Sequence, residues 1–162
     1  MLSTEECERL RSLYRPEKVR ILFVGKSLPA QGTFFYLGTS NLYKSIREAF
    51  EKVYGVRVGQ DPSSFMRFFR DCGCYLDDLC LEPVDDLDDP ERKERRHAAV
   101  PLLADRMAAI QPHPEMVIAV MKGVESYIRK AMLLSGLSCV TFAALPFRVH
   151  GNGLVDILRR RW

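Results

Sequence analysis

The side chains best placed for chemistry begin where an apolar run, residues 21–24, ends at Gly25. Ser27 follows, proline and glycine then break the chain, and two aromatic residues, Phe34 and Phe35, come next. In open α/β sheets the loops at the carboxyl ends of strands hold ligands. A loop with a glycine, a hydroxyl and two aromatic rings therefore predicts a pocket for a flat ligand.

A phosphate-binding loop is the alternative for this segment, because residues 24–27, Val-Gly-Lys-Ser, look like the end of that motif. The motif needs a second glycine five residues before Gly25, and Arg20 occupies that place. We therefore do not expect a nucleoside triphosphatase.

A second candidate region carries the adjacent carboxylates Asp77 and Asp78, within residues 74–81, which are typical of a strand that ends before Pro83. Four more aspartates follow: Asp85, Asp86, Asp88 and Asp89. Such acids suggest a metal site, but they lack the glycine and glutamate of a calcium loop, and acids ahead of a helix commonly form turns and caps. We predict the turn role and no metal.

A third candidate region is the loop of residues 145–152, which precedes the last predicted helix. Asn152 is placed to cap that helix, whose free backbone N–H groups can also bind a phosphate. This loop and the first one converge if their strands lie on the same side of the sheet.

The elements that must position these loops alternate along the chain. Strands are predicted for residues 19–24, 74–81, 115–121 and 138–144, and helices for residues 42–54, 62–72, 100–110 and 123–134 and from residue 154. Ser40 or Asn41 is the expected cap of the first of these helices, and Pro101 is expected to kink or restart the third. The alternation predicts an α/β fold with three layers, α/β/α, around a central four-stranded, mainly parallel sheet.

The composition sets further bounds on the protein. A chain of 162 residues that is 47% hydrophobic is sufficient for one domain, residues 1–162. No stretch has the length of a membrane span and the start of the chain is acidic, so we expect a cytoplasmic protein. Five cysteines, an odd number, favour buried thiols over a disulfide framework. The net charge of +3 is too small to indicate nucleic-acid binding by itself.

The order of these pieces resembles the uracil-DNA glycosylase superfamily over nearly the whole chain, from residue 19 to about residue 160. Residues 25–29 and 32–35 are similar to its water-activating loop and the phenylalanine that follows, residues 77–83 to its base-reading strand, and residues 145–152 to its closing loop. The resemblance implies the three-layer fold and a DNA glycosylase-like protein. Such a protein recognises a damaged or deaminated base extruded from DNA and hydrolyses its N-glycosidic bond.

The resemblance also implies how a base would be held. The base would lie beside Gly25 and stack on Phe35, or on the neighbouring Phe34, while Asp77 or Asp78 reads its edge.

The remaining roles fall on the first and last loops. Ser27 takes one catalytic place, and His150 takes the other if the last loop folds back; the alternative is that His150 contacts DNA or solvent. The DNA-contacting places fall on Pro146, Phe147, Arg148, Val149 and Asn152. The tip of this last loop would enter the duplex where the base left, and Asn152 would help to hold a phosphate.

Three positions differ from the family pattern. Ser27 stands where several branches have a carboxylate or an amide, and Leu145 replaces the histidine of the closing loop, with His150 five residues later. Asp77 or Asp78 replaces the base-reading amide. An ionised carboxylate only accepts hydrogen bonds, so it would repel the carbonyl oxygen beside the ring N–H of uracil. The hypothesis is a pocket that prefers an edge with more donors than uracil has, an inference that a protonated aspartic acid would weaken.

These differences leave a second function open, a non-catalytic module of the same fold that binds nucleic acid or a nucleobase. A small-molecule α/β enzyme unrelated to DNA is a third. One branch of the family carries an iron–sulfur cluster, but only Cys80 lies near a matching position and residues 98–99 are alanines where another ligand should lie, so we predict no cofactor. We expect a monomer that binds DNA, either single-stranded or lesion-containing. A protein that binds DNA is also expected to associate with the nucleoid.

Overall fold

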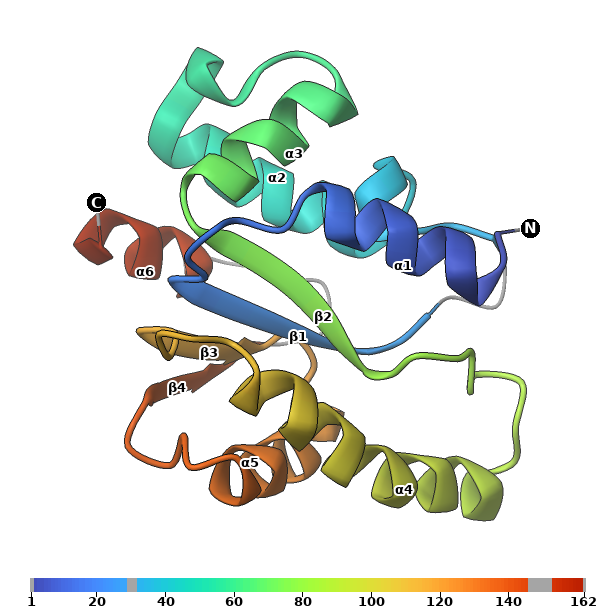
Figure 1. The fold of residues 1–162 in the computed structure, drawn as a ribbon. Helices are drawn as coiled ribbons and strands as arrows, with labels where there is room; N and C mark the ends of the chain where they lie inside the picture. The colour runs from blue at the N-terminus through green and yellow to red at the C-terminus, as the bar shows by residue number, and fades with distance from the viewer. Residues whose placement is uncertain (1, 29–31, 146–152, 162) are drawn as a thin grey trace.

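The protein is built around a sheet of four parallel strands in the order β2-β1-β3-β4, seen in a computed structural model that describes residues 2–28, 32–145 and 153–161 (Figure 1). The strands are β1 (Ile21–Ser27), β2 (Cys74–Cys80), β3 (Met116–Ala119) and β4 (Thr141–Ala144). Each neighbouring pair is parallel. The α/β class and the four-stranded parallel sheet predicted from the sequence are confirmed.

Helices cover both faces of this sheet and so make the outer two of three layers (Figure 1). One face carries α1 (Thr4–Leu13), α2 (Asn41–Tyr54), α3 (Pro62–Asp71) and α6 (Gly153–Arg161), and the other carries α4 (Asp89–Ala108) and α5 (Glu125–Leu134). Three short 3₁₀ turns complete the described elements: η1 (Phe35–Leu37), η2 (Gly55–Val58) and η3 (Lys122–Val124).

Strand β1 is apolar on both sides because each side faces a separate core. Ile21 and Phe23 pack into the cluster beneath α1, α2, α3 and α6, whereas Leu22 and Val24 pack into the cluster beneath α4 and α5. Side chains alternate between the faces of a strand, so a strand covered on both faces must be apolar throughout. This explains why its sequence shows no polar alternation.

Local sequence sets the helix ends. The Ser40 side chain accepts a hydrogen bond from the backbone N–H of Tyr43, which makes Ser40 the cap of α2. Helix α1 was not expected from the sequence, although Ser3 and Glu6 form a capping box at its start.

Helix α4 runs unbroken through Pro101, so the expected restart at that residue is wrong. Pro101 and His97, one turn before it, are both exposed. The carbonyl that loses its helical partner at Pro101 can therefore bond to water, which makes a proline tolerable there.

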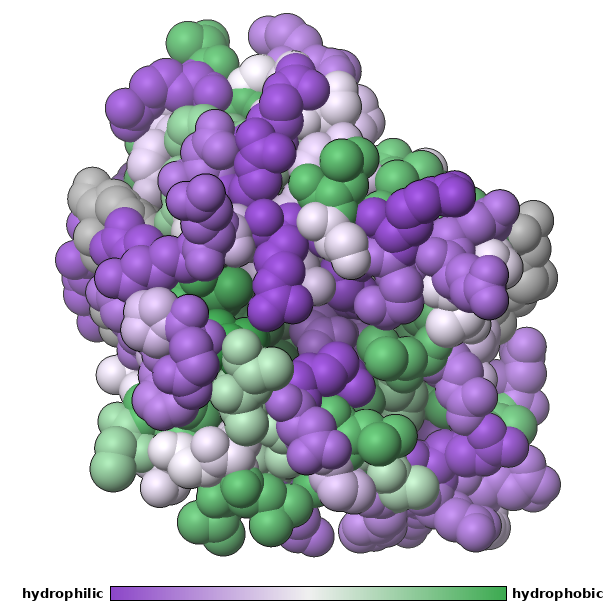
Figure 2. All heavy atoms as spheres, in the orientation of Figure 1, coloured by the Kyte–Doolittle hydropathy of each residue, from purple (hydrophilic) through white to green (hydrophobic). Residues whose placement is uncertain are grey.

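The surface is mixed in character. In the view of Figure 2, hydrophilic side chains cover much of the face and hydrophobic ones appear in separate patches. Among the described residues, no helix is both long and apolar enough to cross a membrane.

Candidate functional site: a cavity at the carboxyl edge of the sheet

A cavity of about 260 Å³ lies where β1, β2 and β3 end, and we call it the sheet-edge cavity. The end of β1, the chain before α2 and the residues after β3 form its walls. Its lining residues are Gly25, Lys26, Ser27, Thr33, Phe34, Phe35, Ser40, Asn41, Leu42, Leu76, Asp78, Asp85, Val120 and Met121. The structure therefore brings together five residues predicted for the site from two distant segments: Gly25, Ser27, Phe34, Phe35 and Asp78.

The aromatic wall of the cavity consists of two rings that the core fixes in place. Phe35 is buried and meets the rings of Tyr36 and Tyr43 edge-on, at centroid distances of 5.0 and 6.1 Å. Phe34 is also buried, with the guanidinium carbon of Arg11 5.6 Å from its ring centroid. Both rings thus pack the core and line the cavity, which gives a rigid apolar wall.

Gly25 makes room for the carboxylate of Asp78. The two residues are register partners on neighbouring strands. A Cβ atom added to Gly25 would lie 2.5 Å from Oδ1 of Asp78 and 3.8 Å from a methyl carbon of Val120. Glycine is therefore required sterically here, because any side chain would displace the carboxylate.

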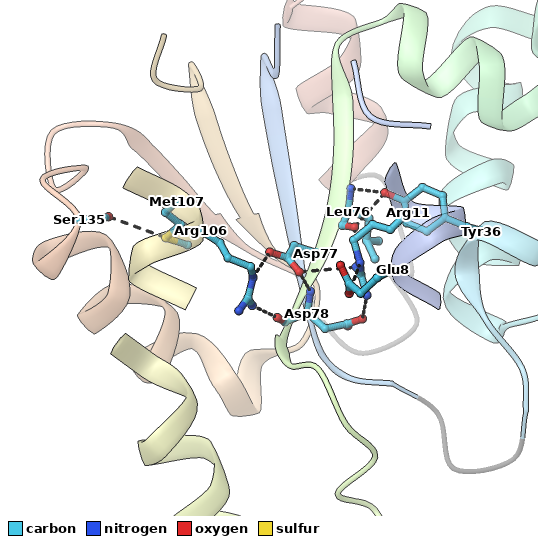
Figure 3. Close-up of polar contacts among 9 residues, drawn as sticks. All are labelled: Glu8, Arg11, Tyr36, Leu76, Asp77, Asp78, Arg106, Met107 and Ser135. Atoms are coloured by element: carbon cyan, nitrogen blue, oxygen red, sulfur yellow. Dashed lines mark hydrogen bonds and ion pairs between the residues drawn. The ribbon is translucent and has the colours of Figure 1, made fainter. Parts of the chain in front are cut away.

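The Asp78 side chain is buried but only partly paired. The residue is 6% exposed, and its Oδ2 accepts a long hydrogen bond of 3.4 Å from Nη2 of Arg11 (Figure 3). Among the described residues, no hydrogen bond reaches Oδ1. One oxygen of a buried carboxylate at the cavity wall is thus available to a ligand.

Burial raises the pKa of Asp78 to about 6, against the lowering effect of the Arg11 guanidinium. The Arg11 contact alone would keep this carboxyl fully ionised, so loss of hydration outweighs it. At neutral pH the group is mostly ionised, and it takes up a proton in mildly acidic solution.

Arg11 and Tyr36 fix the outer edge of β2 beside the cavity (Figure 3). Arg11 is only 1% exposed and donates through Nη1 to the carbonyl of Leu76 at 2.9 Å. The Tyr36 hydroxyl donates to the same carbonyl and accepts from the Leu76 N–H, both at 2.8 Å. The free edge of the sheet is thus satisfied by side chains at this point. Sequence reasoning missed both residues, and the capping box of α1 was the available signal for the helix that carries Arg11.

Asp77 faces a different environment. Its Oδ2 accepts a hydrogen bond of 2.8 Å from Nε of Arg106 on α4, and its Oδ1 accepts one from the backbone N–H of Asp78, also at 2.8 Å (Figure 3). Asp77 is not among the residues that line the sheet-edge cavity. Of the two aspartates predicted to read a base, only Asp78 therefore lies at the cavity.

The lining of the cavity also includes the polar residues Lys26, Ser27 and Asp85. The Ser27 hydroxyl is buried and has no hydrogen-bond partner among the described residues. Lys26 and Asp85 form an ion pair, and both line the cavity. The sequence predicts Asp85 only as part of a turn, and no local signal indicates its place at the cavity. No group of three or more histidine, cysteine or acidic side chains in the described ranges is arranged to hold a metal.

The remaining predicted site residues lie outside the described residues: Pro146, Phe147, Arg148, Val149, His150 and Asn152. The chain on either side of them can be placed. Leu145 donates its backbone N–H to the carbonyl of Ala119 at the end of β3, and a Cβ atom on Gly153 would lie 3.1 Å from the Leu145 side chain. Leu145 therefore lies beside the end of β3, and the residues that follow β3 line the cavity. Gly153, where the described chain resumes, lies close to Leu145.

A second cavity of about 360 Å³ lies between the end of β2 and α4. Its described lining includes Cys80, Leu102 and the ion pair of Glu82 with Arg95, and it contains no aromatic side chain. Although larger, it lacks both the rigid rings and the partly paired buried carboxylate of the sheet-edge cavity.

No known family model matches the chain, and no curated protein sequence matches it.

Proposed function

We propose that the protein is DNA glycosylase-like: it recognises a damaged or deaminated base extruded from DNA in the sheet-edge cavity and hydrolyses its N-glycosidic bond. The observation that carries the proposal is the pairing of a rigid aromatic wall, Phe34 and Phe35, with the buried carboxylate of Asp78 in one cavity. A flat heterocycle needs both an aromatic face to stack on and a polar group at its edge.

The size of the cavity supports a base as the ligand. An apolar cavity of about 150 Å³ is sufficient to hold benzene. The sheet-edge cavity, at about 260 Å³, has room for a larger heterocycle but is small for an extended cofactor. It lies at the carboxyl ends of parallel strands, where open α/β sheets bind ligands.

In the proposed reaction, water attacks the sugar carbon as the bond from that carbon to the base nitrogen breaks. The base leaves with the bonding electron pair and is neutralised by a proton, while the water loses one. Phe34 and Phe35 would hold the base, Asp78 would fix its edge, and the unpaired Ser27 hydroxyl would orient the water.

A non-catalytic base-binding module is the second candidate, and specific contacts favour it. The two carboxylates in the described lining, Asp78 and Asp85, are engaged by the cations of Arg11 and Lys26. Ser27 is a weaker base than a carboxylate. This alternative predicts binding without cleavage.

The deciding experiment uses duplex and single-stranded oligonucleotides with one uracil, hypoxanthine, xanthine or alkylated base. Binding is measured by fluorescence anisotropy at several salt concentrations, and cleavage by alkali treatment after incubation with excess protein. Abasic product supports the enzyme, and salt-dependent binding without product supports the module. Absence of both contradicts a role on DNA and favours a small-molecule enzyme.

A conservative variant tests the aromatic wall. Phe35→Leu keeps most of the packing but removes the ring on which a base would stack, so we expect binding to weaken about tenfold. Phe50→Leu is the matched control, because Phe50 is buried in the same core but does not line the cavity. Equal losses in the two variants would mean that Phe35 acts only in packing.

A protein that acts on DNA bases works where the DNA is, so we propose a cytoplasmic, nucleoid-associated monomer.

A further inference from the structure

The Asp78 carboxylate meets the sheet-edge cavity in one fixed orientation. Arg11 donates to Oδ2, and Arg11 is itself fixed by the carbonyl of Leu76. Oδ1 lies over the bare backbone of Gly25, at the position where a Cβ atom would collide with it. The oxygen without a partner among the described residues is therefore the one beside the Gly25 wall of the cavity.

We infer that Asp78 selects a base whose edge presents two adjacent hydrogen-bond donors, a ring N–H beside an exocyclic amino group, which is the edge of guanine and of guanines altered elsewhere on the ring. This inference rests on the proposed function, since it assumes that the sheet-edge cavity holds a base.

The chemistry of the carboxylate carries this choice. An ionised carboxylate offers about four acceptor sites and no donor, and Arg11 occupies one site of Asp78. Guanine presents two donors side by side and can use the remaining sites. Uracil presents one ring N–H between two carbonyl oxygens, and a carbonyl oxygen against a carboxylate is repelled. Hypoxanthine has the ring N–H of guanine but lacks the amino group.

The surroundings of Asp78 make this discrimination effective. The residue is 6% exposed, so a base that leaves its carboxylate without a donor receives little compensation from water. A buried site built for donors rejects ligands that lack them much more strongly than an exposed site does. Asp77, the other buried carboxylate nearby, is occupied by Arg106 and by the Asp78 amide.

The test uses three single-stranded oligothymidine probes that differ in one central base: guanine, hypoxanthine or uracil. Affinity of the full chain is measured by fluorescence anisotropy at pH 8, where Asp78 is ionised. We expect guanine to bind about tenfold more tightly than hypoxanthine, because the two differ by one amino group, and uracil to bind most weakly.

The outcomes separate this inference from the proposed function. Binding of uracil or hypoxanthine as tight as that of guanine would overturn the inference and leave base recognition intact. Failure of all three probes and of the damaged-base panel to bind would overturn both. The comparison needs only the unaltered protein, so it does not depend on how any variant folds.

Asp78→Asn assigns the preference to this side chain. Arg11 requires an acceptor at the position of Oδ2, so the amide oxygen would face Arg11 and the amide NH₂ would face Gly25. The variant should lose the preference for guanine over hypoxanthine and gain affinity for uracil.

Asp77→Asn removes the same charge from a neighbour that does not line the cavity. It should keep the order guanine, hypoxanthine, uracil. A guanine preference that survives in Asp78→Asn would contradict the assignment to Asp78.

Discussion

Two adjacent residues at the end of β2 show how the two sides of this sheet differ. On the α4 side, Asp77 accepts one hydrogen bond from Arg106 and one from the backbone, each 2.8 Å long. On the α1 side, the Asp78 side chain has one hydrogen bond, of 3.4 Å to Arg11, and its other oxygen has no partner among the described residues.

The difference separates structure from function in the same short segment. A buried carboxylate with good partners on both oxygens holds elements together, and here it connects β2 to α4. A buried carboxylate left partly paired beside a cavity weakens the fold, so its presence requires another explanation, and ligand recognition provides one. The comparison can be tested by removing the partners of each aspartate in turn.

The largest expected effect follows from removing Arg11. Arg11→Met leaves Asp78 without its cation and takes one of the cations from Asp77, so the free energy of unfolding should fall by about 3–5 kcal/mol. Urea denaturation at pH 7.5 measures the change.

Arg106→Met is the counterpart on the other side of the sheet. The Arg106 side chain is 28% exposed, and its loss also removes the hydrogen bond of 2.8 Å to the Asp78 carbonyl. Asp77 keeps Arg11 and the Asp78 amide, so we expect a loss of only about 1–2 kcal/mol. A loss for Arg106→Met as large as that for Arg11→Met would contradict the proposed asymmetry between the two sides.

The contacts of Arg11 show which features of the site could not be predicted from the sequence. Besides the local pair with Glu8, Arg11 has partners 65 and 67 residues away, at Leu76 and Asp78. In the sequence it resembles any solvated arginine of a charged segment, because local periodicity does not reveal a contact of that range. The ion pair of Lys26 with Asp85 joins distant segments in the same way, so the place of Asp85 at the cavity was not predictable.

The strands and most helices were predictable because their signals are local. The four apolar runs and the spacing in α2 and α3 are fixed by which faces must be buried. Because ligands bind at the carboxyl ends of parallel strands, the sequence also predicts a site at that edge, where Gly25, Phe35 and Asp78 lie together. Whether the predicted base-binding roles are correct stays a prediction that the binding experiments test.

The next largest effect concerns binding. Gly25→Ala places a Cβ atom 2.5 Å from Oδ1 of Asp78, so the carboxylate must leave its place, and we expect binding of the guanine probe to weaken about 30-fold. Gly123→Ala is the matched control, since its added Cβ atom meets nothing within 4 Å. Unchanged binding by Gly25→Ala in a folded protein would show that Asp78 does not hold the ligand.

A smaller effect is expected at the edge of β2. Tyr36→Phe removes the hydroxyl that hydrogen-bonds to both the backbone N–H and the backbone carbonyl of Leu76. Arg11 still donates to the carbonyl, but the buried N–H loses its partner. The free energy of unfolding should fall by about 1–2 kcal/mol. Tyr54→Phe is the control, because the buried Tyr54 hydroxyl has no partner among the described residues. Thermal or urea unfolding of both variants should show a loss for Tyr36→Phe alone.

The smallest expected effect is a pH dependence that Asp78 causes. Among the described residues, the charged groups that act on Asp78 are Arg11 on α1, Asp77 on β2 and Arg106 on α4. Burial raises the pKa of the thiols of Cys7 on α1 and Cys80 on β2, so both stay neutral. Both guanidinium groups keep their charge throughout the range considered. Of these described groups, Asp78 is therefore the one that we expect to change the affinity of the cavity near pH 6.

The sign of the effect differs between binding and stability. The two donors of guanine need the ionised carboxylate as their acceptor, so affinity for the guanine probe should fall as the pH drops through about 6, by about tenfold at pH 5.

The stability of the folded protein should change in the opposite direction. Because burial raises the pKa of Asp78 from 3.8 to about 6, the folded state binds the proton more tightly than the unfolded chain, and the contribution of Asp78 to stability grows as the pH falls through that window. Anisotropy titrations and urea denaturation at pH 5 and pH 8 measure both, and Asp78→Asn should abolish both trends. Affinity that rises on acidification would mean that Asp78 binds its ligand as the protonated acid, which would reverse the donor preference inferred for the cavity.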